Sequence, residues 1–370
     1  MANRIKEKYM AGKRYFDYPM LFLVIFLICF GLVMIYSTSS YKSTVTYGNS
    51  YHWLLRQAVA IVLGAVAMVV CCKLDYRIIK SEKFGNGCYW ASIVLLVLVL
   101  IIGAAKKGAV RWISIAGFQF QPSEVSKILV VIYLANRLSA NAHKIRTFKD
   151  SIVIVLPTVP IIALIVTQNL STALVVCSMI GVMLFVVSPK MKELMLTAGG
   201  GIILLFVYLL TANSYRNERV QIWLHPESHK KGFQTMQALY AIGSGGIFGK
   251  GLGQSMQKMG FIPESHNDMI FSIICEELGL FGAVSVILIF LFMIYRFMLI
   301  ANNAPDLLGA LIVVGVMAHI AIQVVLNIAV VTNTIPNTGI TLPFISYGGT
   351  SVLFLLLEMG LVLSVSNLVR

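Results

Sequence analysis

Asp268 is the residue of this sequence whose type and setting best suit acid–base chemistry on a polar substrate. A carboxylate can take a proton from a hydroxyl group that lies within hydrogen-bond reach. Helical positions 268, 272, 276 and 279 share one face, which here carries Asp268, Ser272, Glu276 and Gly279. A polar face on an apolar segment indicates a protein interior or a wet cavity, because ionisable groups facing lipid are costly. Asp268 or Asn267 would also cap the helix N-terminus, and the two roles are compatible.

A second pattern pairs Glu124 with Lys127, three residues apart, a short distance after Arg111. Opposite charges at this spacing neutralise each other on a helix, so a structural ion pair is the simpler interpretation. The alternative is that Lys127 and Arg111 hold an anionic head group while Glu124 positions them. Basic pockets between helices recognise lipid phosphates in this way.

The elements that must position these residues are membrane helices. Of 370 residues, 58% are apolar and only 12% are charged, against about 25% charged in soluble proteins. The formal charge of +14 falls in short clusters between uncharged stretches. This distribution indicates basic loops of a membrane protein and argues against nucleic-acid binding. The six cysteines have no CxxC pair or secreted-module spacing, so we expect neither disulfides nor a thiolate metal site.

The predicted fold is an all-α polytopic membrane protein with ten transmembrane helices. A crossing needs about 20 apolar residues, and ten stretches meet or approach this length: 18–37, 54–73, 88–105, 122–140, 151–168, 170–188, 193–212, 268–295, 307–332 and 342–366. Only a short polar break at 168–172 separates the fifth stretch from the sixth.

The charged loops predict that both chain ends lie in the cytoplasm. More than half of the 29 Lys and Arg residues fall in the N-terminus and the short loops that this orientation places inside, where positive charge is retained. The predicted organisation is a basic cytoplasmic N-terminus (1–17), helices 1–7 (18–212), a large extracytoplasmic loop (213–267) and helices 8–10 (268–370). Of fifteen acids, this topology leaves five for chemistry outside: Glu124, Glu218, Glu227, Glu264 and Asp268.

The long loop carries two further patterns. A short amphipathic piece is expected at 232–242, followed by a glycine cluster at 243–253. The cluster fails the P-loop pattern, which would need glycine at 244 and Ser or Thr at 251. A tight turn with positive φ is therefore the preferred interpretation over ligand contact. His225-Pro226-Glu227-Ser228-His229 also fails the zinc motif HExxH, because the Glu is one position late.

Six motifs in this order resemble the SEDS family (shape, elongation, division and sporulation), whose members include FtsW, RodA and SpoVE. They are Gly-Ala-Val-Arg-Trp-Ile at 108–113, Gln-Pro-Ser-Glu-Val-Ser-Lys at 121–127, Tyr-Arg-Asn-Glu-Arg-Val at 215–220, Ala-Ile-Gly-Ser-Gly-Gly-Ile-Phe-Gly-Lys-Gly at 241–251, Pro-Glu-Ser-His-Asn-Asp-Met-Ile-Phe at 263–271 and Leu-Pro-Phe-Ile-Ser-Tyr-Gly-Gly-Thr-Ser at 342–351. The match runs from about residue 17 to the end of the chain. Segments 31–37 and 252–258 look more like FtsW or SpoVE than RodA.

The resemblance implies a glycosyltransferase that polymerises lipid II into peptidoglycan strands on the outer face of the bacterial cytoplasmic membrane. Its implied partners are a class B penicillin-binding protein, other division proteins and membrane lipids. The family's essential acid falls on Asp268. The other site residues expected from these motifs bind substrate: Arg111, Trp112, Glu124, Lys127, Arg216, Arg219, Lys250, His266 and Ser346.

Two positions depart from the family pattern. Asn169 stands where many members have Asp, and Asn267 stands where Thr is common before the essential acid. Both residues can still cap a helix or form hydrogen bonds, so we expect an active enzyme.

The expected reaction inverts the donor sugar, because lipid II is α-linked and the polymer is β1,4-linked. This chemistry needs a base for the acceptor hydroxyl and cations for the leaving pyrophosphate. Asp268 is the expected base, or a ligand of a divalent cation, Mg²⁺ or Mn²⁺, that positions the acceptor. No nucleotide is implied. The rival interpretations are a lipid II flippase or a division scaffold, since charged groups inside a bundle also fit a transporter.

Overall fold

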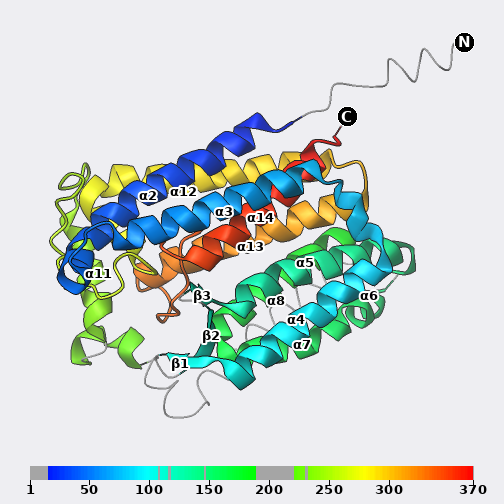
Figure 1. Cartoon of the computed structure of the whole chain (residues 1–370), viewed down its shortest axis with the longest axis horizontal. Coiled ribbons are helices and arrows are strands. Elements are labelled where there is room, and N and C mark those ends of the chain that lie inside the picture. The colour runs from blue at the N-terminus through cyan, green and yellow to red at the C-terminus, as the bar shows by residue number, and fades with distance from the viewer. Residues whose placement is uncertain are drawn as a thin grey trace, which may run out of the picture.

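The computed structural model is a bundle of long helices with one small sheet (Figure 1). It describes residues 16–106, 109–115, 118–145, 147–188, 221–229 and 232–369. The helices run roughly parallel in two groups. One group contains α2 (Tyr18–Tyr47), α3 (His52–Lys73), α12 (Ile270–Asn302), α13 (Leu307–Val331) and α14 (Gly349–Ser366). The other contains α4 (Glu82–Ile102), α5 (Pro122–Asn141), α6 (Phe148–Val155), α7 (Val159–Gln168) and α8 (Leu170–Val187).

Eight helical stretches in the described part of the chain are long and apolar enough to cross a membrane. Seven are α2, α3, α4, α8, α12, α13 and α14, and the eighth runs over Lys149–Gln168. Eight of the ten expected crossings therefore coincide with such a stretch. At the expected crossing 122–140 lies α5, a helix of 20 residues with lower hydropathy. The expected crossing 193–212 lies outside the described residues.

Two prolines explain why the fifth crossing is not one smooth helix. Helix α6 passes into a 3-10 turn, η3 (Leu156–Thr158), and then into α7, because Pro157 and Pro160 cannot donate the helical hydrogen bond. Helix α7 then ends at Asn169, whose extended backbone (φ −155°) separates it from α8. The Asn169 side chain accepts a hydrogen bond from the Ser171 amide (3.1 Å). The predicted break between two helical stretches, each apolar and long enough to cross a membrane, is confirmed.

Two helices, α2 and α14, end or begin at residues that differ from the bounds of the expected crossings. Helix α2 continues ten residues beyond the expected end at 37. The hydroxyl groups of Thr38 and Thr44 in this extension donate to carbonyls of the preceding helical turn (2.8 and 2.9 Å), so they are satisfied within the helix. Helix α14 starts at Gly349, seven residues after the expected start at 342. The positive φ of Phe344 (63°) is incompatible with a helix there. Hydropathy locates the apolar core of a span, not the end of its helix.

A three-stranded antiparallel sheet was not expected. Strands β1 (Ala104–Lys106), β2 (Ala109–Ile115) and β3 (Phe118–Phe120) follow α4 in the order β1-β2-β3. Ile113 lies opposite Phe120, and Trp112 lies opposite Ala104. Strand β2 is rich in aromatic and β-branched residues, which favour a pleated surface. The all-α class therefore describes the bundle and omits this hairpin-like addition.

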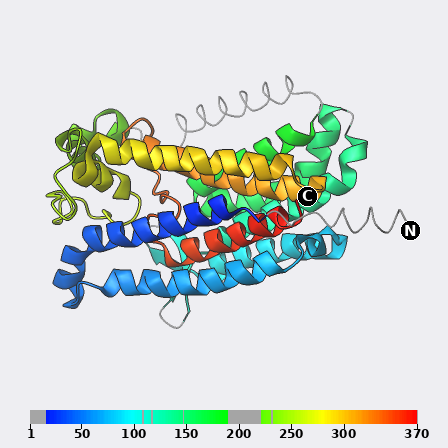
Figure 2. The same ribbon diagram turned by 90° about the horizontal axis from the view of Figure 1, so that it is seen from above.

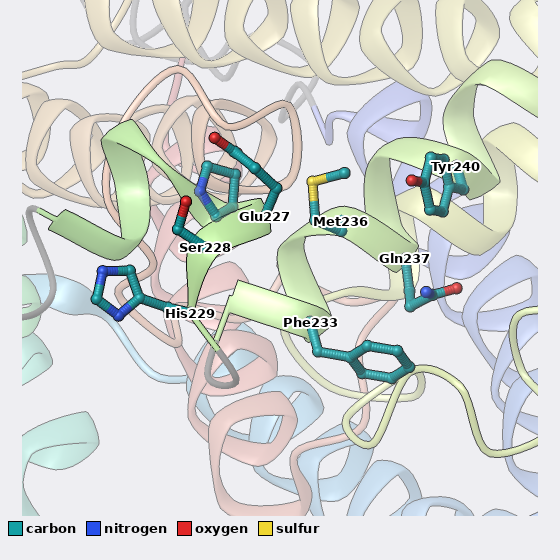
Figure 3. Close-up of a pocket in the computed structure, with 8 residues that line it drawn as sticks. Glu227, Ser228, His229, Phe233, Met236, Gln237 and Tyr240 are labelled. Carbon is teal, nitrogen blue, oxygen red and sulfur yellow. The ribbon is translucent and has the colours of Figure 1, made fainter.

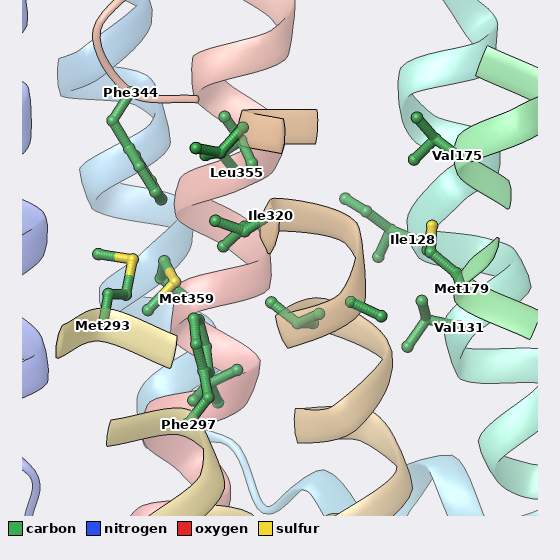
Figure 4. Packing of buried hydrophobic residues seen from close by; sticks show 14 of the residues in the cluster. Ile128, Val131, Val175, Met179, Met293, Phe297, Ile320, Phe344, Leu355 and Met359 are labelled. Carbon is green, nitrogen blue, oxygen red and sulfur yellow. The ribbon is translucent and has the colours of Figure 1, made fainter. Parts of the chain in front are cut away.

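Helix α13 is the centre of the bundle. It packs against α12, α8, α5 and α14, and 72% of its most apolar 18-residue window is buried. Figure 4 shows Ile320 of this helix between Met359 and Leu355 on one side and Ile128 on the other. Most of the α13 surface meets protein, so its buried polar side chains must find partners inside the bundle.

Figure 2 shows the long helices α2 and α12 from above. An ion pair and a buried polar cluster join these two helices near their two ends. At one end the Asp17 carboxylate caps α2 by accepting the Met20 amide proton (2.9 Å). The same carboxylate pairs with the Arg296 guanidinium at 2.6 Å. Toward the other end, Ser37 donates to the Glu277 carboxylate (2.7 Å). These two helices therefore keep a fixed register.

Candidate active site

Asp268 lies in the turn that precedes α12, two residues before the helix begins, and only 9% of the residue is exposed. Its neighbours on the turn are held by the segment that leads into α14. The Tyr347 amide donates to the His266 carbonyl (2.8 Å), and the Ser346 hydroxyl donates to the Asn267 carbonyl (2.7 Å). The structure thus brings three predicted site residues together: His266, Asp268 and Ser346.

Asn327 fixes the Asp268 backbone from the central helix. Its side-chain amide donates to the Asp268 carbonyl at 2.8 Å and to the Ile340 carbonyl at 2.7 Å. The residue is completely buried. One amide therefore joins the turn before α12 to the segment after α13, and both flank the Asp268 carboxylate. A side chain at Gly339 would begin 3.8 Å from Asp268 Oδ2, so the bare backbone of this segment passes beside the acid.

His266 is part of an aromatic cluster. Its ring centroid lies 5.2 Å from that of Trp53 and 5.7 Å from that of Tyr347. Trp53 and Tyr347 also meet edge to face at 4.8 Å. Only 3% of His266 is exposed. This histidine supports the shape of the turn, and its predicted contact with substrate stays a prediction.

Glu124 and Lys127 form the ion pair that the spacing favours. Lys127 Nζ lies 2.9 Å from Glu124 Oε1 and donates to Gln323 Oε1 at 3.3 Å. The exposed fractions of the lysine and glutamate side chains are 3% and 12%. Gln323 in turn donates to the Thr341 carbonyl (3.0 Å). The pair is thereby connected to the segment beside Asp268, and head-group binding by Lys127 stays a prediction.

Two amides of α13 were not identified from the sequence. Gln323 and Asn327 lie one helical turn apart and both bond the 340–341 backbone. Gln57 on α3 adds a third anchor, since its side chain accepts from the Gly348 amide (3.1 Å). The available signal was a lone amide in an apolar helix, which needs a partner inside the protein.

Lys250 is engaged by Glu276. Its ammonium lies 2.7 Å from Glu276 Oε1 and donates to Ser244 Oγ at 2.9 Å. Ser272 and Glu276 are completely buried and Gly279 is also buried, so these positions face protein as expected. The expectation of one helical face shared with Asp268 is wrong, because α12 begins only at Ile270 and its helical backbone is interrupted at Gly279. A role of Lys250 at phosphate would require it to leave this partner.

The glycine cluster is a tightly packed turn against α12. The Lys250 and Gly251 amides donate to the carbonyls of Glu276 and Glu277, both at 2.9 Å. The helix is interrupted there, because Gly279 has φ 67° and ψ −165°. A Cβ atom on Gly249 (φ 78°) would lie 2.2 Å from the Glu277 carbonyl oxygen. The positive-φ turn interpretation agrees with this geometry.

A second ion pair holds the same loop. Lys258 Nζ lies 2.7 Å from Glu277 Oε1, and both side chains are almost fully buried. Ser37 of α2 bonds both partners, at 2.9 Å to the lysine and 2.7 Å to the glutamate. Consecutive glutamates thus bind two lysines of one loop. Both glutamates fall inside the expected crossing 268–295, where the sequence pattern indicates no partner for them.

The structure describes the side chain of only one of the remaining predicted site residues, Trp112. Trp112 is half-buried on β2, and the side chain of Arg111 lies outside the described residues. Arg216 and Arg219 also lie outside them. No group of three His, Cys, Asp or Glu side chains that could hold a metal occurs in the described ranges. A cation at Asp268 would therefore need oxygen ligands from a bound phosphate as well.

A cavity of about 530 Å³ lies on the long loop, and none of the predicted site residues that the structure describes lines it (Figure 3). It is bordered by the 3-10 turn η4 (Pro226–Ser228) and by α11 (Phe233–Ser244), the helix expected near 232–242. Figure 3 shows Phe233, Gln237 and Tyr240 along one side of α11. The indole of Trp223 donates to the Asn333 carbonyl (3.0 Å) and joins this region to the end of α13.

Comparisons with known proteins agree with this arrangement. The chain is 36% identical over 362 residues to a probable peptidoglycan glycosyltransferase FtsW of Geobacter metallireducens, covering 95% of each protein. It is 37% identical over 364 residues to stage V sporulation protein E of Bacillus subtilis, covering 96% of this chain and 98% of the relative.

Solved structures of the same kind of protein have a similar fold. A chain of a peptidoglycan synthase complex superposes with a TM-score of 0.79 at 29% identity, covering 95% of this chain and 97% of the other. The rod shape determining protein RodA of Thermus thermophilus superposes with a TM-score of 0.71 at 28% identity, covering 95% and 96%. The family model for FtsW, RodA and SpoVE, described as cell cycle protein, matches residues 18–370. The chain therefore belongs to the FtsW/RodA/SpoVE family of multi-pass membrane proteins.

Proposed function

We propose that this protein is a peptidoglycan glycosyltransferase that polymerises lipid II into β1,4-linked strands for septal wall synthesis. One observation carries the proposal: the buried acid Asp268 lies two residues before a long apolar helix, and the backbone of its turn is held by Asn327 at the Asp268 carbonyl and by Ser346 at the Asn267 carbonyl. Relatives that cover nearly the whole chain are named peptidoglycan glycosyltransferases. An acid that is fixed in position and partly screened from water suits proton abstraction.

In this proposal Asp268 takes the proton of the acceptor 4-hydroxyl while that oxygen displaces undecaprenyl pyrophosphate from the donor sugar. The bonds from Asn327 to Asp268 and Ile340 support a fixed direction of the carboxylate. Cations must neutralise the leaving pyrophosphate. Lys127 and Lys250 already have carboxylate partners, so Arg111, Arg216 and Arg219 are the better candidates for this charge, and arginine binds phosphate in a bidentate manner.

A divalent cation, Mg²⁺ or Mn²⁺, fits this site only together with the substrate. Asp268 would be its protein ligand, and pyrophosphate oxygens would complete the shell, as Mg²⁺ commonly binds. The cation would supply charge to the leaving group. The chain's own residues bind and orient the sugars and remove the proton.

The proposed topology has ten crossings with both chain ends in the cytoplasm and Asp268 on the extracytoplasmic side. Its support is that Asp268 lies at the opposite end of α12 from Arg296, and that Arg77 pairs with Asp306 (3.7 Å) just beyond the Arg296 end of this helix. Lys and Arg mark the cytoplasmic side. The membrane is then the bacterial cytoplasmic membrane.

The proposed partner is a class B penicillin-binding protein, which would crosslink the strands that this chain makes. Support comes from the structural neighbour, which belongs to a peptidoglycan synthase complex described as coordinating polymerization and crosslinking. Further partners would be other division proteins. Neither a nucleotide nor a nucleic acid is part of the proposal.

The test is strand synthesis from purified lipid II in detergent, where sidedness has no meaning. The purified chain, with and without a class B penicillin-binding protein and Mg²⁺, should produce polymer. Glu227→Gln is the matched control because this acid is exposed on the loop and should leave synthesis unchanged. A chain that moves lipid II across vesicles but makes no polymer under any of these conditions would be a flippase and would overturn the proposal.

A further inference from the structure

The glycine-rich loop turns large apolar side chains outward. Between residues 246 and 256 the exposed fractions are 64% for Ile247, 81% for Phe248, 54% for Leu252 and 61% for Met256. The single charged residue of this segment, Lys250, reaches back to Glu276 in an ion pair. We call these four side chains the apolar tip. Contiguous exposed apolar side chains of this size mark a contact with lipid or protein.

The apolar tip is continuous with the lipid-facing surface of α12. The Leu280 amide donates to the Gly246 carbonyl (2.9 Å), and the Phe281 amide donates to the Ile247 carbonyl (3.0 Å). Leu280 and Phe281 are themselves 60% and 69% exposed on a helix apolar enough to cross a membrane. The tip therefore extends sideways from a surface that already faces acyl chains.

Two buried polar contacts between α2 and α12 indicate how far the apolar tip lies from the centre of the membrane. Asp17 pairs with Arg296 at one end, and Ser37 bonds Glu277 at the other. Twenty residues separate Asp17 from Ser37, and nineteen separate Glu277 from Arg296. At about 1.5 Å per residue either helix spans about 30 Å between these contacts, which matches the hydrocarbon core of about 30 Å.

The backbone bonds place the tip at this boundary. Leu280 and Phe281 follow Glu277 along α12 on the membrane side, and Gly246 and Ile247 are bonded to them. Ile247 therefore lies at or slightly inside the level where the hydrocarbon begins. The two lysines of the loop, Lys250 and Lys258, are bound by glutamates at the same level, so both of their charges are neutralised by ion pairs with α12.

We propose that the loop inserts Ile247, Phe248, Leu252 and Met256 into the lipid leaflet on the Asp268 side of the membrane. Lipid acyl chains are the partner, because the tip is uncharged and adjoins lipid-facing helix surface at the hydrocarbon boundary. The insertion holds the loop, and the turn that follows it up to Asp268, at a fixed height above the bilayer. This inference rests on the chain spanning a membrane and does not depend on the reaction that we propose.

The test places a photoreactive group at the tip. Phe248→p-benzoylphenylalanine, in chain reconstituted into vesicles of phosphatidylethanolamine and phosphatidylglycerol, should give peptide–lipid adducts on irradiation. Phe281→p-benzoylphenylalanine is the positive control on α12. Val45→p-benzoylphenylalanine is the matched negative control: Val45 is 70% exposed but lies eight residues beyond Ser37, about 12 Å outside the hydrocarbon.

Mass spectrometry of the adducts decides the result. Lipid adducts at 248 and 281 with none at 45 are expected. Adducts at 281 alone would overturn the proposal, and so would a label at 248 that crosslinks an added class B penicillin-binding protein in place of lipid. Strand synthesis is not the readout, so a failed proposal about the reaction and a failed insertion give different results.

Discussion

At the scale of single residues, the site depends on amides as much as on acids. The Asp268 carboxylate would carry the chemistry, but Asn327 decides where its backbone lies. A buried amide that bonds two carbonyls cannot be replaced by an apolar side chain without leaving both carbonyls unsatisfied. Each such loss costs about 1–3 kcal/mol.

Asn327→Leu is therefore expected to lower the free energy of unfolding by about 2–6 kcal/mol and to slow strand synthesis. The fall should be in kcat, because Asn327 positions Asp268 and touches it only through the backbone. Thermal unfolding in detergent and steady-state synthesis measure the two effects. Asn303→Ala is the control, since that side chain makes one exposed bond to the Leu299 carbonyl; an Asn327 variant that matches it in both measurements would contradict this role.

Asp268 could be identified from the sequence because the chain has only fifteen acids, and the expected topology leaves five of them for chemistry outside the membrane. It could not identify the partners of Glu276 and Glu277, since Lys250 and Lys258 lie about 20 residues away on a loop whose path depends on packing. Asn327 and Gln323 could have been found, because a helical spacing of four puts both amides on one face of an apolar helix.

At the scale of elements, the close approach of the glycine loop to α12 replaces helical hydrogen bonds that Gly279 interrupts. The apolar pattern of residues 268–295 predicts a span but contains no sign of this interruption, because the loop backbone supplies the missing partners. The strands at 104–120 were not predicted for a different reason: they are only three to seven residues long and lie between apolar helices, so their sequence pattern is short.

Gly249→Ala should destabilise the chain by more than the value of about 1 kcal/mol usual for a strained glycine site, because the new Cβ would meet the Glu277 carbonyl oxygen. Gly243→Ala is the matched control, since nothing lies within 4 Å of its Cβ position and its φ is not positive. Melting temperatures in detergent compare the two. Equal temperatures for both variants would show that the loop can move away from α12 without cost.

A buried pair joins α13 to α14. His319 Nδ1 lies 2.8 Å from Glu358 Oε2, and both residues are at most 2% exposed. Breaking one partner of such a pair costs about 3–5 kcal/mol, whereas replacing both by apolar residues is often nearly neutral. His319→Leu and Glu358→Leu should each destabilise the chain, and the double variant should recover most of the loss. Additive losses in this double-mutant cycle would contradict an interaction between the two residues.

At the end of the bundle where Arg296 lies, the 3-10 turn η1 (Tyr76–Lys80) bonds the start of α13. Tyr76 donates its hydroxyl proton to Asp306 Oδ1 (3.0 Å). Burial, and then the Asp306 carboxylate, raise the pKa of Tyr76 to about 12. The folded state favours the neutral phenol, so this contribution is complete below the ordinary tyrosine pKa of about 10 and is lost as the pH rises toward 12.

Tyr76→Phe should therefore reduce stability by about 0.5–1.5 kcal/mol at neutral pH and remove this part of the alkaline loss. Unfolding curves of both proteins between pH 8 and pH 12, compared as differences, measure it. Parallel curves across that range would show that Tyr76 has no raised pKa.

At the scale of the whole molecule, long apolar helices pack side by side, and polar contacts between α2 and α12 lie at two levels along the helix axes. Asp17 with Arg296 and Ser37 with Glu277 lie about one bilayer core apart. Asp268 precedes Glu277 by nine residues, so the proposed topology would put it beyond the hydrocarbon, where the pyrophosphate of a lipid substrate would be. Hydropathy predicted most of these spans because lipid imposes a fixed length and composition.

The central claim is that Asp268 removes the acceptor proton in strand synthesis. The most direct measurement compares polymer formed from purified lipid II in detergent by the wild-type chain, by Asp268→Asn and by the exposed-acid control Glu227→Gln, each shown to be folded by its melting temperature. Asp268→Asn should bind its penicillin-binding partner and melt like the wild type but form no strands. Polymer at near wild-type rate from folded Asp268→Asn would contradict the claim.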